Sequence, residues 1–222
     1  MEHEHPARVR DMPEPRETPS MASHFLRRLL SWPYRACLAG LYRIGARPWH
    51  LTLASLATNL VIGVLLLRDQ RLLPGLLLVP AGAFDVFDGS IARLRNEESR
   101  LGAFLDSSLD RISDLILFGC LFWSLAGQGE GPEAARALAT MVVSLGVSHT
   151  RAAAESEGVV LPGGLFQRLE RYVALLIGLC VPGALLPVLA ILTALGGLTF
   201  MQRLWTGTAR LARRLPVPGD RA

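Results

Sequence analysis

Residues 85–110 read DVFDGSIARLRNEESRLGAFLDSSLD. The stretch holds the aspartates Asp85, Asp88, Asp106 and Asp110. It lies between two uncharged apolar runs, residues 72–84 and residues 115–126. Acids that end one apolar run and begin the next predict two antiparallel helices joined by a polar turn at residues 94–101. The first two aspartates are three residues apart and the last two are four apart, so each pair shares a helix face. All four carboxylates can therefore point into one space.

The same alternation of apolar runs and polar flanks extends along the chain. The apolar runs are residues 51–67, 72–84, 115–126, 137–147, 172–187 and 188–201. A membrane helix needs ~20 residues, so most of these runs must include polar neighbours to complete a span. The flanks of the second to sixth runs are, in order, Asp85 and Asp88, Asp106 to Asp114, His149 and Arg151, Arg168 and Arg171, and Arg203 and Arg210. Successive spans run in opposite directions, so these flanks all lie on one side. We predict an all-α integral membrane protein with six transmembrane helices and a polar cavity on that side.

The basic residues indicate which side this is. All 23 are arginines, and most lie in the loops and tails on the side of the polar flanks. The positive-inside rule then places both termini and the cavity in the cytosol of a multi-pass protein of the cell membrane. The net charge of +4 is explained by arginines facing anionic lipid, and we expect no nucleic-acid partner. The three cysteines are scattered without metal-ligand spacing.

The chain divides into one membrane domain and two tails. Residues 1–20 are rich in Pro, Glu and Arg, and we expect a disordered polar tail there. Residues 21–214 form the expected membrane domain, and residues 215–222 a C-terminal tail. Residues 22–32 mix arginines with leucines and predict either an interfacial helix of about 12 residues or a plain linker.

The four aspartates predict a metal site. Carboxylates gathered in a partly dehydrated space cannot all ionise without cations, and oxygen-rich sites suit Mg²⁺ or Mn²⁺. Two such ions can hold a pyrophosphate and neutralise a leaving phosphate. The alternative is a set of polar residues at a helix end, paired with nearby arginines. Gly89 and Gly102 lie beside the acidic pairs, where they indicate either a close nucleotide or close helix packing.

The spacing resembles a known signature. The pattern Asp-x2-Asp-Gly-x2-Ala-Arg-x8-Gly-x3-Asp-x3-Asp is typical of the CDP-alcohol phosphotransferases. The chain matches all eight fixed positions: Asp85, Asp88, Gly89, Ala92, Arg93, Gly102, Asp106 and Asp110. The resemblance extends over about residues 21–214 and implies a six-helix membrane fold, often a homodimer. It also implies that an alcohol hydroxyl attacks the β-phosphorus of a CDP-linked lipid and releases CMP.

The resemblance implies roles for individual residues. Asp85, Asp88, Asp106 and Asp110 bind two Mg²⁺ or Mn²⁺ ions, and Asp110 also acts as the general base. The CDP-lipid site is expected to include Trp49, Thr52, Gly89, Arg93, Ser99 and Gly102. Trp49 departs from the family, which often has a small polar residue at this position.

Three segments are most similar to the inositol-phosphate branch of the family. These are residues 105–114, 148–155 and 168–171. The expected acceptor site is Ser148, Arg151, Arg168 and Arg171. Arg151 and Arg171 would hold a phosphate of the acceptor; the alternative is that they only anchor the topology. Ala153 and Leu101 depart from that branch, which usually has a basic residue and a Phe there.

Two other functions remain possible on the sequence. An intramembrane prenyltransferase also binds pyrophosphate through aspartate-rich motifs, but it usually has more spans and two separated motifs. An ion transporter with carboxylate sites would predict broken helices or an internal repeat, and the chain has neither pattern.

Overall fold

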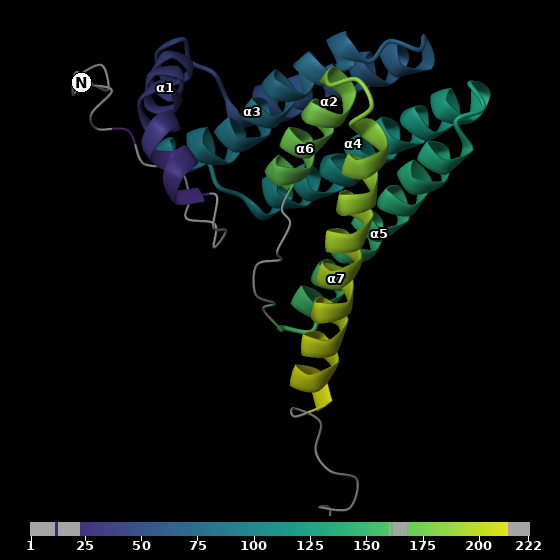
Figure 1. Ribbon diagram of the computed structural model, residues 1–222. Coiled ribbons are helices and arrows are strands. Elements are labelled where there is room, and N and C mark those ends of the chain that lie inside the picture. Colours follow the sequence, from purple (N-terminus) through teal and green to yellow (C-terminus); the bar gives the residue numbers. More distant parts are fainter. Residues whose placement is uncertain (1–11, 13–22, 160, 162–167, 213–222) are drawn as a thin grey trace, which may run out of the picture.

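The computed structural model describes Met12, residues 23–159, Leu161 and residues 168–212. Seven α-helices, and no strand, make up this part of the chain (Figure 1). They are α1 (Ser23–Arg43), α2 (Pro48–Leu67), α3 (Leu72–Leu94), α4 (Arg100–Gly127), α5 (Gly131–Ser156), α6 (Arg168–Cys180) and α7 (Leu185–Ala212). The all-α prediction is confirmed. The tails expected at residues 1–20 and 215–222 lie outside the described residues, Met12 excepted.

Each of the six predicted apolar runs forms the apolar part of a helix, from α2 to α7. One predicted boundary is wrong. The fifth run was expected to continue to residue 187, but α6 ends at Cys180 and α7 begins at Leu185. The break lies at Pro182, which lacks an N–H for a helix, and at Gly183, whose φ of 76° suits glycine. Hydrophobicity continues through this turn, so the apolar pattern alone did not reveal it.

The N-terminal segment is helical rather than a linker, and its helix continues beyond the predicted residues 22–32. α1 extends to Arg43 and packs against α3 at one edge of the molecule (Figure 1). Leu38 and Ala39 are buried in this contact, and the Tyr34 hydroxyl lies 2.6 Å from the Ser90 hydroxyl of α3.

The remaining helices pack around one apolar core. α2 contacts both α3 and α4, α3 contacts α6, and α5 contacts both α4 and α7. The core includes Ile62, Leu66, Leu78, Leu117, Phe118, Leu121, Leu175 and Leu189. Many large apolar side chains also lie on the outer surface, such as Leu60, Leu76 and Trp123. An exposed apolar surface of this extent is what a lipid-facing protein presents.

Among the described residues, three helices are long and apolar enough to cross a membrane by themselves: α2, α3 and α7. The described part of α6 has 13 residues. At a rise of 1.5 Å per residue it extends over only about 20 Å, less than the ~30 Å hydrocarbon core of a bilayer. The structure is thus that of an all-helical membrane protein with three clear candidate spans.

The turn between α3 and α4 forms where the sequence predicted it. α3 ends because Asn96 adopts a φ of 53°, and the Glu97 amide donates back to the Ala92 carbonyl at 2.9 Å. Ser99 caps the start of α4, because its hydroxyl accepts a hydrogen bond from the Gly102 amide at 3.0 Å. This short reversal brings the end of α3 beside the start of α4, which positions the aspartates.

Candidate active site

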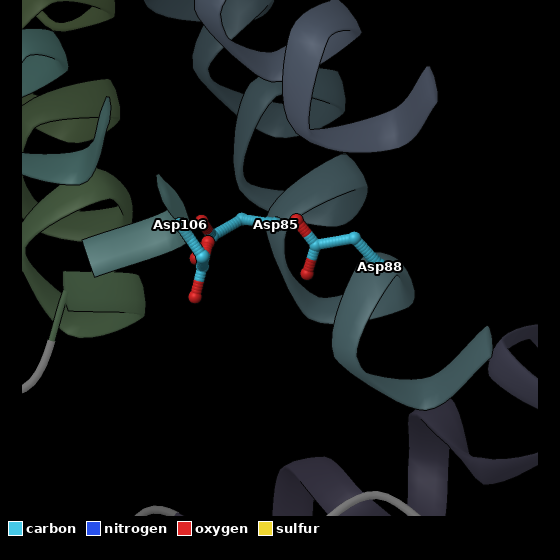
Figure 2. Close-up of side chains that lie close together, drawn as sticks. All are labelled: Asp85, Asp88 and Asp106. Carbon is cyan, nitrogen blue, oxygen red and sulfur yellow. The ribbon is translucent and has the colours of Figure 1, made fainter. Parts of the chain in front are cut away.

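Three of the four predicted metal ligands meet at this junction. Asp85 and Asp88 come from α3 and Asp106 from α4, and one carboxylate oxygen of each lies within 4.8 Å of those of the others. Figure 2 shows their carboxyl groups turned toward one another. Asp88 is buried, with 5% of its surface exposed, while the other two are half-buried. The predicted convergence of the two helix ends is therefore present for these three residues.

Asp110 joins the group through an arginine of α6. Arg168 Nη1 lies 2.5 Å from Asp85 Oδ1 and also contacts Asp110 Oδ1. Asp85, Asp88, Asp106 and Asp110 are called the aspartate cluster below. The Arg168 side chain is only 13% exposed, so this guanidinium lies inside the site. Arg168 contacts two of the four carboxyl groups, so the cluster carries an excess of negative charge if all four ionise.

Two buried residues hold Arg168 in place. Arg168 Nη2 donates to the Tyr172 hydroxyl at 3.1 Å, and that hydroxyl donates to Asn59 Oδ1 at 2.9 Å. Asn59 of α2 is fully buried and also donates to the Ser55 carbonyl. The sequence analysis missed both residues, although a lone amide within an uncharged apolar run is a signal of a polar contact between helices.

Of the residues expected at the CDP-lipid site, one contacts the aspartate cluster directly. Thr52 of α2 donates to Asp88 Oδ2 at 2.8 Å. A side chain at Gly89 would meet no atom closer than Arg93 Nη1 at 3.8 Å, so the backbone there is open to a ligand. Arg93 itself donates to the Ser90 hydroxyl at 3.1 Å. Trp49, by contrast, is 55% exposed and its ring lies against that of His50.

Ser99 and Gly102 have a structural contact with each other. The Ser99 hydroxyl caps α4 by accepting from the Gly102 amide, and a Cβ atom at Gly102 would lie 3.1 Å from that hydroxyl oxygen. The glycine therefore permits the tight first turn of α4. This contact explains the two residue types at these positions without a ligand.

The residues expected at the acceptor site are divided between two places. Arg168 lies within the aspartate cluster, and Arg171, one turn further along α6, forms an ion pair with Asp114 at 3.1 Å. Arg151 instead pairs with Glu155 on the surface, where the two side chains are 61% and 48% exposed. Ser148 accepts a hydrogen bond from Arg111 through its carbonyl, at 3.4 Å.

Arg203 of α7 is a further basic residue at this end of the molecule. It is 9% exposed and donates to the Val147 carbonyl at 3.0 Å. The sequence analysis noted it only as a charged flank. A buried arginine in a membrane helix is costly, and such residues commonly face a polar cavity.

The aspartate cluster has the chemistry of a divalent-cation site. Its donors are carboxylate oxygens, which hard cations prefer. Two oxygens on opposite sides of Mg²⁺ are about 4.2 Å apart, since each Mg–O bond is about 2.1 Å. The observed limit of 4.8 Å for the three aspartates requires only a small adjustment of the side chains. The surplus of negative charge beside Arg168 further favours cations.

The fold and this cluster together define an all-α membrane protein with a carboxylate-rich site able to hold metal ions. A family model described as CDP-alcohol phosphatidyltransferase matches residues 46–206, and the chain belongs to that family. It is therefore a membrane-associated transferase that moves a phosphatidyl-type group from a CDP-linked lipid to an alcohol. The family predicted from the aspartate pattern is confirmed.

Several curated proteins are similar over most of their length. The chain is 34% identical over 199 residues to phosphatidylinositol phosphate synthase of Mycobacterium marinum, covering 82% of this chain and 85% of that protein. It is 34% identical over 148 residues to the protein of the same name from Corynebacterium glutamicum, covering 65% and 68%. An archaetidylinositol phosphate synthase of Methanothermobacter thermautotrophicus is 37% identical over 134 residues, covering 58% and 66%.

Solved structures show the same fold. The chain resembles the crystal structure of Mycobacterium tuberculosis phosphatidylinositol phosphate synthase with CDP-DAG bound, with a TM-score of 0.70 and 30% identity. The match covers 78% of this chain and 92% of that one. A crystal structure of the same enzyme in complex with manganese and citrate gives a TM-score of 0.70 at 29% identity, covering 78% and 88%.

Proposed function

We propose that this protein transfers the phosphatidyl group of CDP-diacylglycerol to an inositol phosphate and releases CMP. The observation that carries this proposal is the contact of Arg168 with Asp85 and Asp110. It places a buried guanidinium, the side chain best suited to bind a phosphate, beside the carboxylates expected to catalyse the transfer. The similarity to synthases of phosphatidylinositol phosphate and archaetidylinositol phosphate supports the same acceptor.

The four aspartates are proposed to hold two Mg²⁺ or Mn²⁺ ions. Asp85, Asp88 and Asp106 already lie close enough to share an ion, and Asp110 is connected to them through Arg168. Bound divalent cations would orient the pyrophosphate and neutralise charge on the leaving phosphate. The hydroxyl of Thr52 donates a hydrogen bond to Asp88 Oδ2, and this bond would help to fix the orientation of the Asp88 carboxylate. The manganese complex of a homologue supports the choice of ion.

The CDP-lipid is proposed to approach the side of the cluster that faces α2 and the end of α3. The expected contacts are Trp49, Thr52, Gly89, Arg93, Ser99 and Gly102. Gly89 supports this because its backbone is open to a ligand. Ser99 and Gly102 would contribute through the first turn of α4, whose free N–H groups favour a phosphate. Trp49 offers an exposed aromatic ring for a base or a lipid chain.

The acceptor is proposed to bind among Ser148, Arg151, Arg168 and Arg171, with its hydroxyl near Asp110. Asp110 would take the proton as the oxygen attacks the β-phosphorus, and the bond between that phosphorus and CMP would break. Most of the rate would come from positioning and from neutralised charge. The Arg151 side chain is exposed, so it would contact the acceptor at the entrance of the site rather than within the site.

We further infer that residues 21–214 form one domain of the cell membrane with six transmembrane helices, α2 to α7, a cytosol-facing polar cavity and both termini in the cytosol. α1 would lie at the interface, and the protein would be a homodimer. Reporter fusions within residues 127–131 and 155–158 should report opposite sides of the membrane. The same side for both would contradict the six-span topology.

The function is tested with purified protein and CDP-diacylglycerol. Labelled inositol phosphate, glycerol phosphate, serine and inositol are supplied one at a time with Mg²⁺ or Mn²⁺, and CMP release is measured. We expect release with inositol phosphate, its loss in excess chelator and its return with metal. If CMP were released with unphosphorylated inositol but not with inositol phosphate, the proposed acceptor would be wrong. A prenyltransferase or an ion transporter would release no CMP with any of the four.

A further inference from the structure

Asp114 is a buried acid that the proposed mechanism does not use. It lies on α4, one helical turn beyond Asp110, and only 3% of its surface is exposed. Its Oδ2 atom lies 3.1 Å from Arg171 Nη2 of α6 and accepts a hydrogen bond from the Ser144 hydroxyl of α5 at 2.6 Å. Arg171 Nη1 in turn donates to the Ser144 oxygen. Three helices thus converge on one closed contact, called the Asp114 bracket below.

The Arg171–Asp114 pair of the bracket repeats, one helical turn away, the Arg168–Asp110 pair of the aspartate cluster. Arg168 and Arg171 are three residues apart on α6, and they pair with Asp110 and Asp114, which are four apart on α4. Each acid–arginine pair is therefore one turn from the other along both helices. The side chain of Arg171 is 15% exposed, close to the 13% of Arg168, so the two guanidiniums have similar access to the site.

The bracket leaves donor capacity on Arg171 unused. A guanidinium has five N–H donors, and the bracket engages one on each terminal nitrogen. Nε of Arg171 is buried and has no hydrogen-bond partner among the described residues, and the same holds for Asp114 Oδ1. A structural ion pair would be expected to satisfy such buried atoms. A pair that holds an arginine for an incoming anion leaves donors free.

We propose that Asp114 and Ser144 are positioning residues that orient Arg171 to receive the phosphate of the acceptor. Asp114 fixes one edge of the guanidinium and Ser144 fixes its rotation, which leaves a second N–H on each terminal nitrogen for a phosphate. The two arginines then form a prearranged pair for one phosphate group. This inference rests on the proposed function, because it needs an acceptor that carries a phosphate.

The test compares Asp114→Asn and Ser144→Ala with the wild-type protein, with both substrates varied. Each variant is expected to raise the KM for inositol phosphate by about 10-fold, which is within the range of a charge-assisted contact. The KM for CDP-diacylglycerol is expected to remain unchanged. Arg171→Ala should produce a similar or larger rise, and Asp114→Asn combined with Arg171→Ala should be no worse than Arg171→Ala alone.

A matched control is available on α5. Thr140 lies one turn before Ser144, is equally buried, and has its hydroxyl 2.9 Å from that of Thr193 on α7. Thr140→Ala removes a buried hydroxyl contact between helices away from the bracket. It should lower the melting temperature without changing either KM. The same pattern for Ser144→Ala and Asp114→Asn, a lower melting temperature with an unchanged acceptor KM, would mean that the bracket is only structural and would overturn the inference.

A charge exchange sharpens the distinction. Asp114→Arg combined with Arg171→Asp restores an ion pair but places a carboxylate where the phosphate should bind. We expect the KM for inositol phosphate to stay high in this double variant, even if the restored ion pair returns its melting temperature to that of the wild-type protein. Recovery of the acceptor KM together with stability would overturn the positioning role. If the wild-type protein turns over no phosphorylated acceptor, the proposed function fails instead, and the wild-type assay detects this before any variant is compared.

Discussion

The two ends of the helical bundle both carry polar clusters, but the clusters differ in how much negative charge they gather and in how far water reaches them. At the end opposite the aspartates, the α2–α3 and α4–α5 turns bring together Asp69, Arg71, Gln128 and Glu130, called the turn cluster. Arg71 pairs with Glu130 at 2.7 Å, and Asp69 accepts hydrogen bonds from Ser124 and Gln128 at 2.8 Å. The Arg71 and Glu130 side chains are 36% and 35% exposed, so water also solvates them.

The aspartate cluster is built differently. It has four carboxyl groups, and Arg168 contacts two of them, Asp85 and Asp110. Nε of Arg168 is buried without a partner among the described residues. A buried charge without a partner is costly, so such a cluster does not serve stability alone. The contrast teaches that several carboxylates gathered in a partly buried space, rather than the mere presence of ion pairs, mark the functional end of this bundle.

The largest expected effect comes from removing a carboxylate of the aspartate cluster. Asp106→Ala should lower turnover by about 10³-fold, because a site that stabilises developing charge loses one of its ligands. The fold should persist, since the change removes one of several mutually repelling acids. CMP release and thermal unfolding of the same preparation measure both. The matched control is Asp69→Ala in the turn cluster, which should keep full activity.

A second test separates catalysis from metal binding at the same end. Asp110→Asn preserves the shape and one oxygen of the side chain but cannot accept a proton. It should lower kcat by about 10²-fold if Asp110 is the general base. The KM for CDP-diacylglycerol should change less. Glu130→Gln makes the same chemical change in the turn cluster and should leave kcat unaltered; a kcat near the wild-type value for Asp110→Asn would remove the base from the proposed mechanism.

The aspartate cluster could be predicted in large part from the sequence because its geometry is local. Asp85 and Asp88 share one helix, Asp106 and Asp110 share the next, and a short polar turn joins the two helices. Helical spacing therefore determines which acids share a face. The alternation of apolar runs and polar flanks also located α2 to α7, except at Pro182 and Gly183, where an apolar run continues through a turn.

The arginine contacts could not be predicted in the same way. Arg168 meets Asp85 across 83 residues of sequence, and Tyr172 meets Asn59 across 113. Such contacts depend on which helices lie side by side, and neither propensity nor periodicity determines that. The sequence analysis grouped Arg151 with Arg168 from the resemblance to the inositol-phosphate branch, whereas the structure places Arg151 on the surface beside Glu155.

A third test asks whether stability comes from close helix packing rather than from either cluster. Gly196 and Gly197 are adjacent on α7. A Cβ atom at Gly196 would lie 2.7 Å from Val143 Cγ1 of α5, whereas one at Gly197 would meet nothing within 4 Å. Gly196→Ala should therefore destabilise the protein by about 1–3 kcal/mol through overpacking. Gly197→Ala should instead stabilise the helix by ~0.5–1 kcal/mol. Unfolding of both variants in one detergent measures the difference, and equal effects would contradict the packing explanation.

The smallest expected effect concerns the ion pair of the turn cluster. Arg71 and Glu130 form a short contact, but both side chains are about one-third exposed, so solvent screens their attraction. A double-mutant cycle with Arg71→Ala, Glu130→Ala and both together should give a coupling energy below about 1 kcal/mol. The value should fall further at high salt, since ions screen exposed charges. Turnover should be unchanged in all three variants, because none of them touches the aspartate cluster. A coupling energy above about 2 kcal/mol would mean that the pair behaves as a buried one, and the contrast between a solvated ion pair at one end and partly buried carboxylates at the other would no longer hold.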